Sequence, residues 1–150
     1  MNTQKLYEND LGLWIQQHIL LLKESRFSEM DIEHLIEELE DMSKSNQREL
    51  KNRLRVLIAH LLKWQYQATG RGTSWKSTIR EQRRALNDLL SDAPSLNNRI
   101  SDVVQDIYED AVESASEETC LAVTIFPQKC PYTNQQLLDK DFYSEDSGIA

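Results

Sequence analysis

The amino-acid sequence predicts an all-α protein, a bundle of four main helices followed by a short C-terminal helix. Apolar residues recur at intervals of three and four over long stretches of the chain, as they do along one face of an amphipathic helix. The 150 residues include only four Gly and three Pro, too few for the turns of a many-stranded β-sandwich or barrel. We expect one helical domain over residues 1–143 and a disordered tail over residues 144–150.

The first half of the chain predicts two helical segments. The first covers roughly residues 6–24, and its apolar stripe is wide enough to contact neighbours on two sides. The second covers residues 28–66 without Pro or Gly, but its apolar face fades between residues 43 and 49. This segment is therefore either one long helix or two helices broken near Ser45-Asn46. The residues expected to form the core faces here are Leu11, Trp14, Ile15, Ile19, Leu22, Ile32, Leu35, Ile36, Leu39 and Met42.

The second half of the chain predicts three more helices. The Gly-rich stretch 70–74 reads as a loop, and a third helix follows it to about residue 91. Pro94 suits the first turn of a fourth helix, whose apolar residues recur up to Ala111. The sequence Thr133-Asn134-Gln135-Gln136 has the pattern of a capping box and predicts a short helix through Leu138.

Charge is distributed in three blocks, although the net charge is −8. Residues 1–50 carry five basic and eleven acidic side chains, residues 51–84 carry nine and one, and residues 85–150 carry three and thirteen. The acidic total disfavours a non-specific nucleic-acid coat, whereas the basic middle block leaves room for a local anion site.

Targeting and redox features predict a cytoplasmic protein without a cofactor. The start of the chain is too polar for a signal peptide, and the apolar stretch 11–22 is interrupted by two Gln and a His, so we expect no membrane span. The two Cys do not form a disulfide framework or a metal-ligand pattern.

Several spaced motifs occur together along the chain. They are the stretches 35–42, 60–66 and 74–83, then Pro94-Ser95-Leu96, Glu118-Thr119, Phe126-Pro127 and Cys130-Pro131-Tyr132. In this order they resemble a bacterial, mostly cyanobacterial, family catalogued as domain of unknown function 29. The resemblance covers about residues 6–142, implies a small all-helical protein and leaves the function open.

One set of residues invites a metal or acid–base interpretation. Helical carboxylates and a His can ligate a metal ion, and a His that titrates near neutral pH can act as a general base. The alternative is structural: solvated carboxylates, and a partly buried His held by a carboxylate. The chain has no Glu-x-x-His pair and no catalytic motif, so the sequence leaves open whether the protein is an enzyme. The candidate cleft consists of Glu37, Glu38, Asp41, His60, Trp64 and Trp75.

A second set is basic: Arg71, Lys76, Arg80, Arg83 and Arg84. These residues follow a Gly-rich loop and the start of a helix, a setting that suits phosphate or nucleic acid. Because acidic blocks flank them, we favour pairing with acidic helices of the same molecule or of a neighbour. The sequence thus predicts an interaction or regulatory module that forms a homo-oligomer or binds a protein partner through charged helix faces. Nucleic-acid or phosphate binding and metal-dependent or acid–base catalysis are the alternatives.

Overall fold

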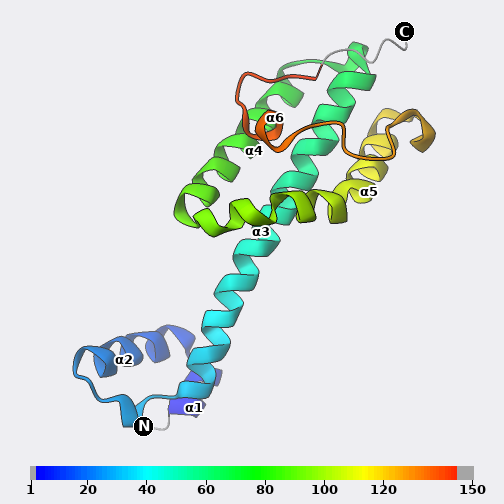
Figure 1. Ribbon diagram of the computed structural model, residues 1–150. Helices are drawn as coiled ribbons and strands as arrows, with labels where there is room; N and C mark the ends of the chain where they lie inside the picture. The colour runs from blue at the N-terminus through cyan, green and yellow to red at the C-terminus, as the bar shows by residue number, and fades with distance from the viewer. Residues whose placement is uncertain (1–2, 145–150) are drawn as a thin grey trace. The chain divides into compact units, whose positions relative to one another are not determined.

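The computed structural model describes residues 3–144, which form helices joined by turns and irregular segments and contain no strand (Figure 1). The all-α prediction is confirmed, and the segment between residues 32 and 66 is one unbroken helix. Short 3₁₀ turns connect several helices, among them η1 (Phe27–Glu29) and η3 (Pro94–Arg99). The α-helices are α1 (Thr3–Asn9), α2 (Leu11–Lys23), α3 (Ile32–Tyr66), α4 (Thr73–Asp92), α5 (Ile100–Thr119) and α6 (Asn134–Leu138).

The chain divides into two compact units, Met1–Ser45 and Asn46–Ala150, and α3 contributes residues to both. The expectation of one domain over residues 1–143 stays a prediction. Residues 145–150 of the expected tail lie outside the described residues. The hydroxyl of Ser144, by contrast, is buried and donates a hydrogen bond of 2.6 Å to the carbonyl of Leu61.

In the first unit, the helix predicted over residues 6–24 is two helices, α1 and α2. Asp10 separates them because its carboxylate accepts a hydrogen bond of 3.1 Å from the N–H of Leu13 and so caps α2. The prediction also placed the start of the next helix at Ser28, but α3 begins at Ile32. The carboxylate of Asp31 accepts from the N–H of His34 there, which is the same capping role.

The second unit contains a continuous apolar core built from the C-terminal half of α3, α4, α5 and the segment around α6 (Figure 1). The third and fourth helices predicted from the sequence are present as α4 and α5, and their residues Ile79, Leu86, Ile100 and Ile107 are at most 2% exposed. The helix at Pro94 starts as the 3₁₀ turn η3 before α5 begins. The capping box of α6 is present as predicted.

Candidate functional site

Nearly all exposed large apolar side chains of the described residues belong to the first unit. Eleven of the twelve in residues 3–144 lie between positions 11 and 42, and the twelfth is Val123. The eleven are Leu11, Leu13, Ile15, Ile19, Leu20, Leu22, Phe27, Ile32, Ile36, Leu39 and Met42. Monomeric proteins rarely expose apolar side chains in such a group unless the surface binds something.

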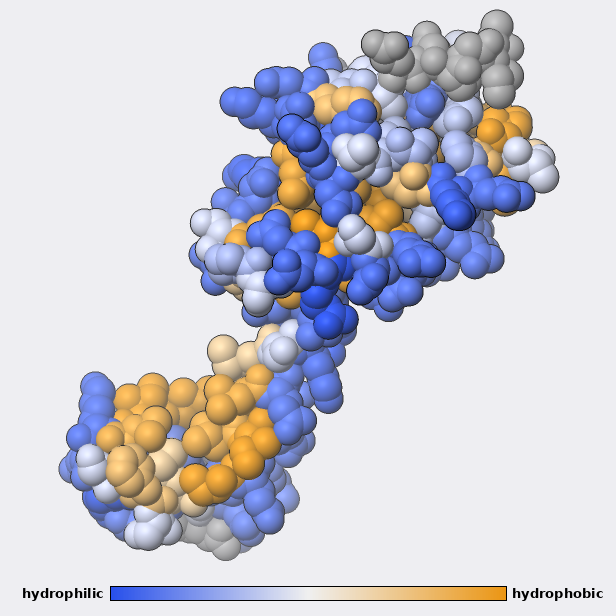
Figure 2. Space-filling view, in the orientation of Figure 1, coloured by the Kyte–Doolittle hydropathy of each residue, from blue (hydrophilic) through white to orange (hydrophobic). Residues whose placement is uncertain are grey.

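Eight of these side chains form two stripes at helical spacing, and we call them together the apolar face. They are Leu11, Ile15, Ile19 and Leu22 on α2, and Ile32, Ile36, Leu39 and Met42 on α3. Each is between 41% and 63% exposed. Hydrophobic colour covers both α2 and the first part of α3 in a single view (Figure 2).

The core prediction for these eight positions is wrong, because all of them are exposed. The buried side of α2 carries Trp14, His18 and Leu21 instead. Helical periodicity identifies an apolar stripe but does not say what covers it. The first unit has too few elements to cover both sides of α2, which agrees with the width of the stripe in the sequence.

A polar cluster holds α1, α2 and α3 together on a different side of these helices. The ring of His18 stacks on Trp14 at 4.0 Å, and its Nε2 accepts a hydrogen bond of 2.9 Å from the N–H of Asp31. Tyr7 stacks on His34 at 3.9 Å and donates a hydrogen bond of 2.6 Å to Glu38. These contacts fix α1 without placing it over the apolar face.

The same contacts shift three pKa values. The hydrogen bond to Glu38 raises the pKa of the Tyr7 phenol. The Asp31 carboxylate, 2.6 Å from Nδ1 of His34, raises the pKa of that imidazole. Burial alone would raise the pKa of Asp31, but the hydrogen bonds from His34 outweigh it and the pKa is lowered. The contact between Asp31 and His34 thus favours the ionised carboxylate and the protonated imidazole.

The candidate cleft residues are divided between the two units. Glu38 accepts from Tyr7, whereas Glu37 and Asp41 are exposed on α3 in the first unit. The remaining members, His60, Trp64 and Trp75, belong to the second unit. No group of three or more His, Cys, Asp or Glu side chains in residues 3–144 is arranged to hold a metal ion.

His60 lies in an arrangement that the sequence did not reveal. Its Nδ1 donates a hydrogen bond of 2.9 Å to the carbonyl of Val56, and its Nε2 lies 3.3 Å from Nζ of Lys63. Lys63 is only 3% exposed and forms an ion pair with Glu118. Its Nζ also lies 5.1 Å from the ring centre of Trp75. The sequence predicted a carboxylate partner for His60, but its ring nitrogens contact the Val56 carbonyl and Lys63, and the Glu118 carboxylate pairs with Lys63.

Burial lowers the pKa of His60, and the positive charge of Lys63 lowers it further. In the neutral imidazole, the lone pair of Nε2 accepts a hydrogen bond from the Lys63 ammonium and is therefore occupied. Lys63 and Glu118 are 55 positions apart, and no local motif signals their pairing.

The five residues of the basic set have different environments. Arg83 is 2% exposed and donates hydrogen bonds to the carbonyls of Leu137 at 2.9 Å and Gln136 at 3.1 Å. Burial lowers the pKa of its guanidinium. Arg71 donates to the carbonyl of Trp64 at 2.6 Å. These two cations hold the backbone of the second unit.

The other three basic residues are exposed on α4. Arg84 pairs with Glu81 at 2.9 Å, and Nζ of Lys76 lies 5.6 Å from the ring centre of Tyr143. Together with Arg80 they form an exposed ridge at i, i+4, i+8 spacing.

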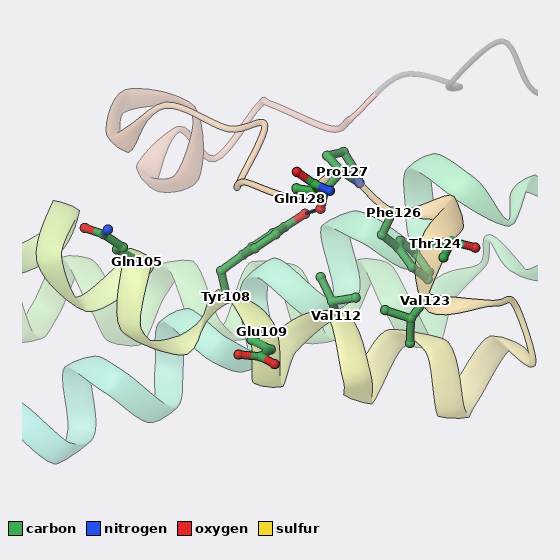
Figure 3. A pocket seen from close by; sticks show the side chains of 9 residues that line it. All are labelled: Gln105, Tyr108, Glu109, Val112, Val123, Thr124, Phe126, Pro127 and Gln128. Atoms are coloured by element: carbon green, nitrogen blue, oxygen red, sulfur yellow. Dashed lines mark hydrogen bonds between the residues drawn. The ribbon is translucent and has the colours of Figure 1, made fainter.

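A pocket of about 490 Å³ lies between α5 and the segment 123–128 (Figure 3). Val112, Val123 and Phe126 supply its apolar lining, and the Tyr108 hydroxyl donates a hydrogen bond of 2.7 Å to the carbonyl of Pro127. Its polar lining includes Glu109 and Thr124. An adjoining pocket of about 350 Å³ includes Cys130, whose thiol pKa is raised by burial, which disfavours the reactive thiolate.

None of the helices within residues 3–144 is both long enough and apolar enough to cross a membrane. Comparison with curated proteins and with solved structures found no match to the chain. A family model described as "Domain of unknown function DUF29" matches residues 6–143, nearly the whole length, and agrees with the motif resemblance. The chain therefore belongs to the DUF29 family.

Proposed function

We propose that this protein is a helical interaction module whose docking surface is the apolar face of the first unit. The observation that supports the proposal is the group of exposed large apolar side chains in residues 11–42. Among the described residues of the second unit, Val123 is the only large apolar side chain that is exposed. This differs from the interaction predicted through charged helix faces, since the surface is apolar and the charges lie at its border.

The apolar face can supply enough free energy for docking. Complete burial of a Leu, Ile or Met side chain contributes about 1.5–3 kcal/mol. Since the eight side chains are roughly half exposed, covering each contributes roughly 1 kcal/mol, and covering all of them on the order of 8 kcal/mol. A partner that buries an apolar surface of its own doubles this gain. The total then exceeds the association cost of about 4–15 kcal/mol.

The shape and charge of the face favour helices as the partner. The two stripes have the spacing at which side chains of a third or fourth helix interdigitate. Glu33 and Glu40 are exposed on α3 beside its stripe, so the partner should carry neutral or basic residues at the contact border.

Photocrosslinking in native cells tests the docking role. A benzophenone amino acid replaces Ile36, which is 51% exposed on the apolar face, or Val123, which is 55% exposed in the second unit and serves as the matched control. We expect discrete protein adducts from position 36 and none from position 123. The absence of adducts at position 36, or equal adducts at both positions, would contradict the proposal.

Anion binding is a second candidate, supported by the exposed ridge of Lys76, Arg80 and Arg84. If nucleic acid binds there, affinity for an oligonucleotide falls steeply as salt rises, and the triple substitution to Glu abolishes it. The same triple variant tests the docking through charged faces: it should lower the molar mass in light scattering only if the ridge holds a partner.

Acid–base catalysis has the least support, because the Nε2 lone pair of His60 faces the Lys63 ammonium. A proton-shuttling His needs a pKa near neutral pH. NMR titration of His60 is the test, and the structure leads us to expect a pKa below the ordinary 6.5. A value at or above 6.5 would favour the catalytic alternative.

A further inference from the structure

We infer that the apolar face is occupied by the same face of a second copy of this chain, with α2 of each copy packed on α3 of the other. The two first units then form a four-helix bundle about a two-fold axis. The inference rests on the proposed docking function and names its partner.

The interior of the first unit is the first argument. Only Trp14, His18, Leu21 and Asp31 are buried among its described residues, and two of these four are polar. Eleven large apolar side chains remain exposed in the same unit. A unit of about 45 residues is near the lower limit for a stable core of its own. A second copy adds the missing half of this core.

The two stripes match each other in length, which is the second argument. Leu11 to Leu22 spans about 17 Å along α2, and Ile32 to Met42 spans about 15 Å along α3, at 1.5 Å per residue. In a two-fold interface every contact between residue i of one copy and residue j of the other occurs twice. Each stripe of one copy therefore finds an apolar stripe of nearly equal length on the other, so that neither is left uncovered.

The area agrees with a stable dimer. At about half exposure, each of the eight side chains presents roughly 80 Å² of apolar surface, and the face presents on the order of 600 Å² per copy. Stable interfaces bury about 800 Å² per partner, of which the border supplies the polar part.

The charges at the border are self-complementary. Lys23 is exposed at the C-terminal end of α2, next to the α2 stripe, and Glu33 and Glu40 border the α3 stripe. When α2 packs on α3 of the other copy, this Lys faces that acidic border. An anionic membrane fits less well, because residues 1–50 carry five basic against eleven acidic side chains.

Charge complementation between two variants of the purified full chain tests the arrangement. Ile15→Glu puts a carboxylate in the α2 stripe, and Ile36→Lys puts an ammonium in the α3 stripe. We expect light scattering at tens of micromolar to give the wild-type chain a mass of twice 17.5 kDa and each variant alone a mass of 17.5 kDa. Mixing the variants should restore the dimer, because the new Glu and Lys then meet at one contact while the other contact stays apolar.

The matched control is Val123→Glu, which places the same charge on an apolar position of the second unit that is 55% exposed, against 42% for Ile15, and should leave the dimer intact. Far-UV circular dichroism of each variant verifies that its helices are present. A variant without helices is replaced by the milder Ile15→Ser or Ile36→Ser, for which we expect a dissociation constant raised at least tenfold.

Three outcomes would overturn the inference: a monomeric wild-type chain, variants that remain dimeric with their helices intact, or a mixture that stays monomeric. A monomer that still forms adducts with another protein from position 36 refutes self-association and keeps the docking function. A monomer without adducts refutes both. A monomer that floats with phosphatidylcholine vesicles, and fails to do so as Ile15→Glu, refutes both in favour of a lipid surface.

Discussion

Replacing Arg83 by Met removes a buried guanidinium from the second unit while keeping the length and apolar character of the side-chain stem. In the folded protein this side chain is 2% exposed and donates to the carbonyls of Gln136 and Leu137. It also lies 5.9 Å from the ring centre of Phe142 and 5.7 Å from that of Tyr143. The substitution leaves both carbonyls without this donor.

The expected loss follows from these contacts. Hydrogen bonds that involve a charged group contribute about 1.5–3 kcal/mol each, so two of them contribute roughly 3–6 kcal/mol. The variant recovers part of this because a buried charge no longer has to be desolvated, and Nη1 has no hydrogen-bond partner among the described residues. We expect a net destabilisation of about 2–4 kcal/mol, or a melting temperature lower by roughly 10–20 °C.

Urea unfolding followed by circular dichroism measures this difference, with Arg80→Met as the control. Arg80 lies on the same helix but is exposed, so its substitution should change stability by less than about 0.5 kcal/mol. Arg83→Lys should give an intermediate loss, because an ammonium lacks the fork that reaches two carbonyls. Equal stability of Arg83→Met and Arg80→Met would refute the structural role of Arg83.

Two further predictions concern stability. The contact with Asp31 raises the pKa of His34 in the folded state, so the stabilisation is complete below the ordinary pKa of 6.5 and is lost as pH rises through the raised value. His34→Gln should therefore lower the melting temperature more at pH 5.5 than at pH 8.5, and equal effects would contradict the pairing. A Cβ at Gly70 would overlap the indole of Trp75, whereas one at Gly72 meets nothing within 4 Å. Calorimetry should show Gly70→Ala destabilised by about 1–3 kcal/mol and Gly72→Ala unchanged or slightly stabilised, and a reversed order would disprove this packing.

Local patterns accounted for most of the helices. Periodicity located the helices of the second half and their buried faces, and the capping box at Thr133 formed as expected. The helix boundaries of the first half were less predictable, because a single capping residue can end one helix and start the next without changing the apolar pattern. Asp10 lies inside an apolar-periodic stretch that reads as one helix, and its carboxylate divides that stretch in two.

The candidate site residues were harder to predict, because burial depends on contacts between distant parts of the chain. Arg83 lies outside the i, i+4, i+8 ridge of exposed cations: it follows Ile79 by four positions and precedes Leu86 by three, which places it on the apolar side of the helix. This spacing signalled its burial but did not show which groups would hold the buried charge. The carbonyls that hold it come from residues more than 50 positions away. The pairing of Lys63 with Glu118, 55 positions apart, was missed for the same reason.

The sequence by itself determined the all-α class, the alternation of charge and the family, whereas it left open whether residues 28–66 form one helix or two. These properties depend on composition and on spacing within a few helical turns. Only the tertiary structure decided which apolar stripes are covered. The same 3.6-residue spacing describes Ile79, which is fully buried in the second unit, and Ile36, which is 51% exposed in the first. Whether a stripe becomes core or binding surface depends on the number of neighbouring elements that can pack on it, and this number is set by the whole fold.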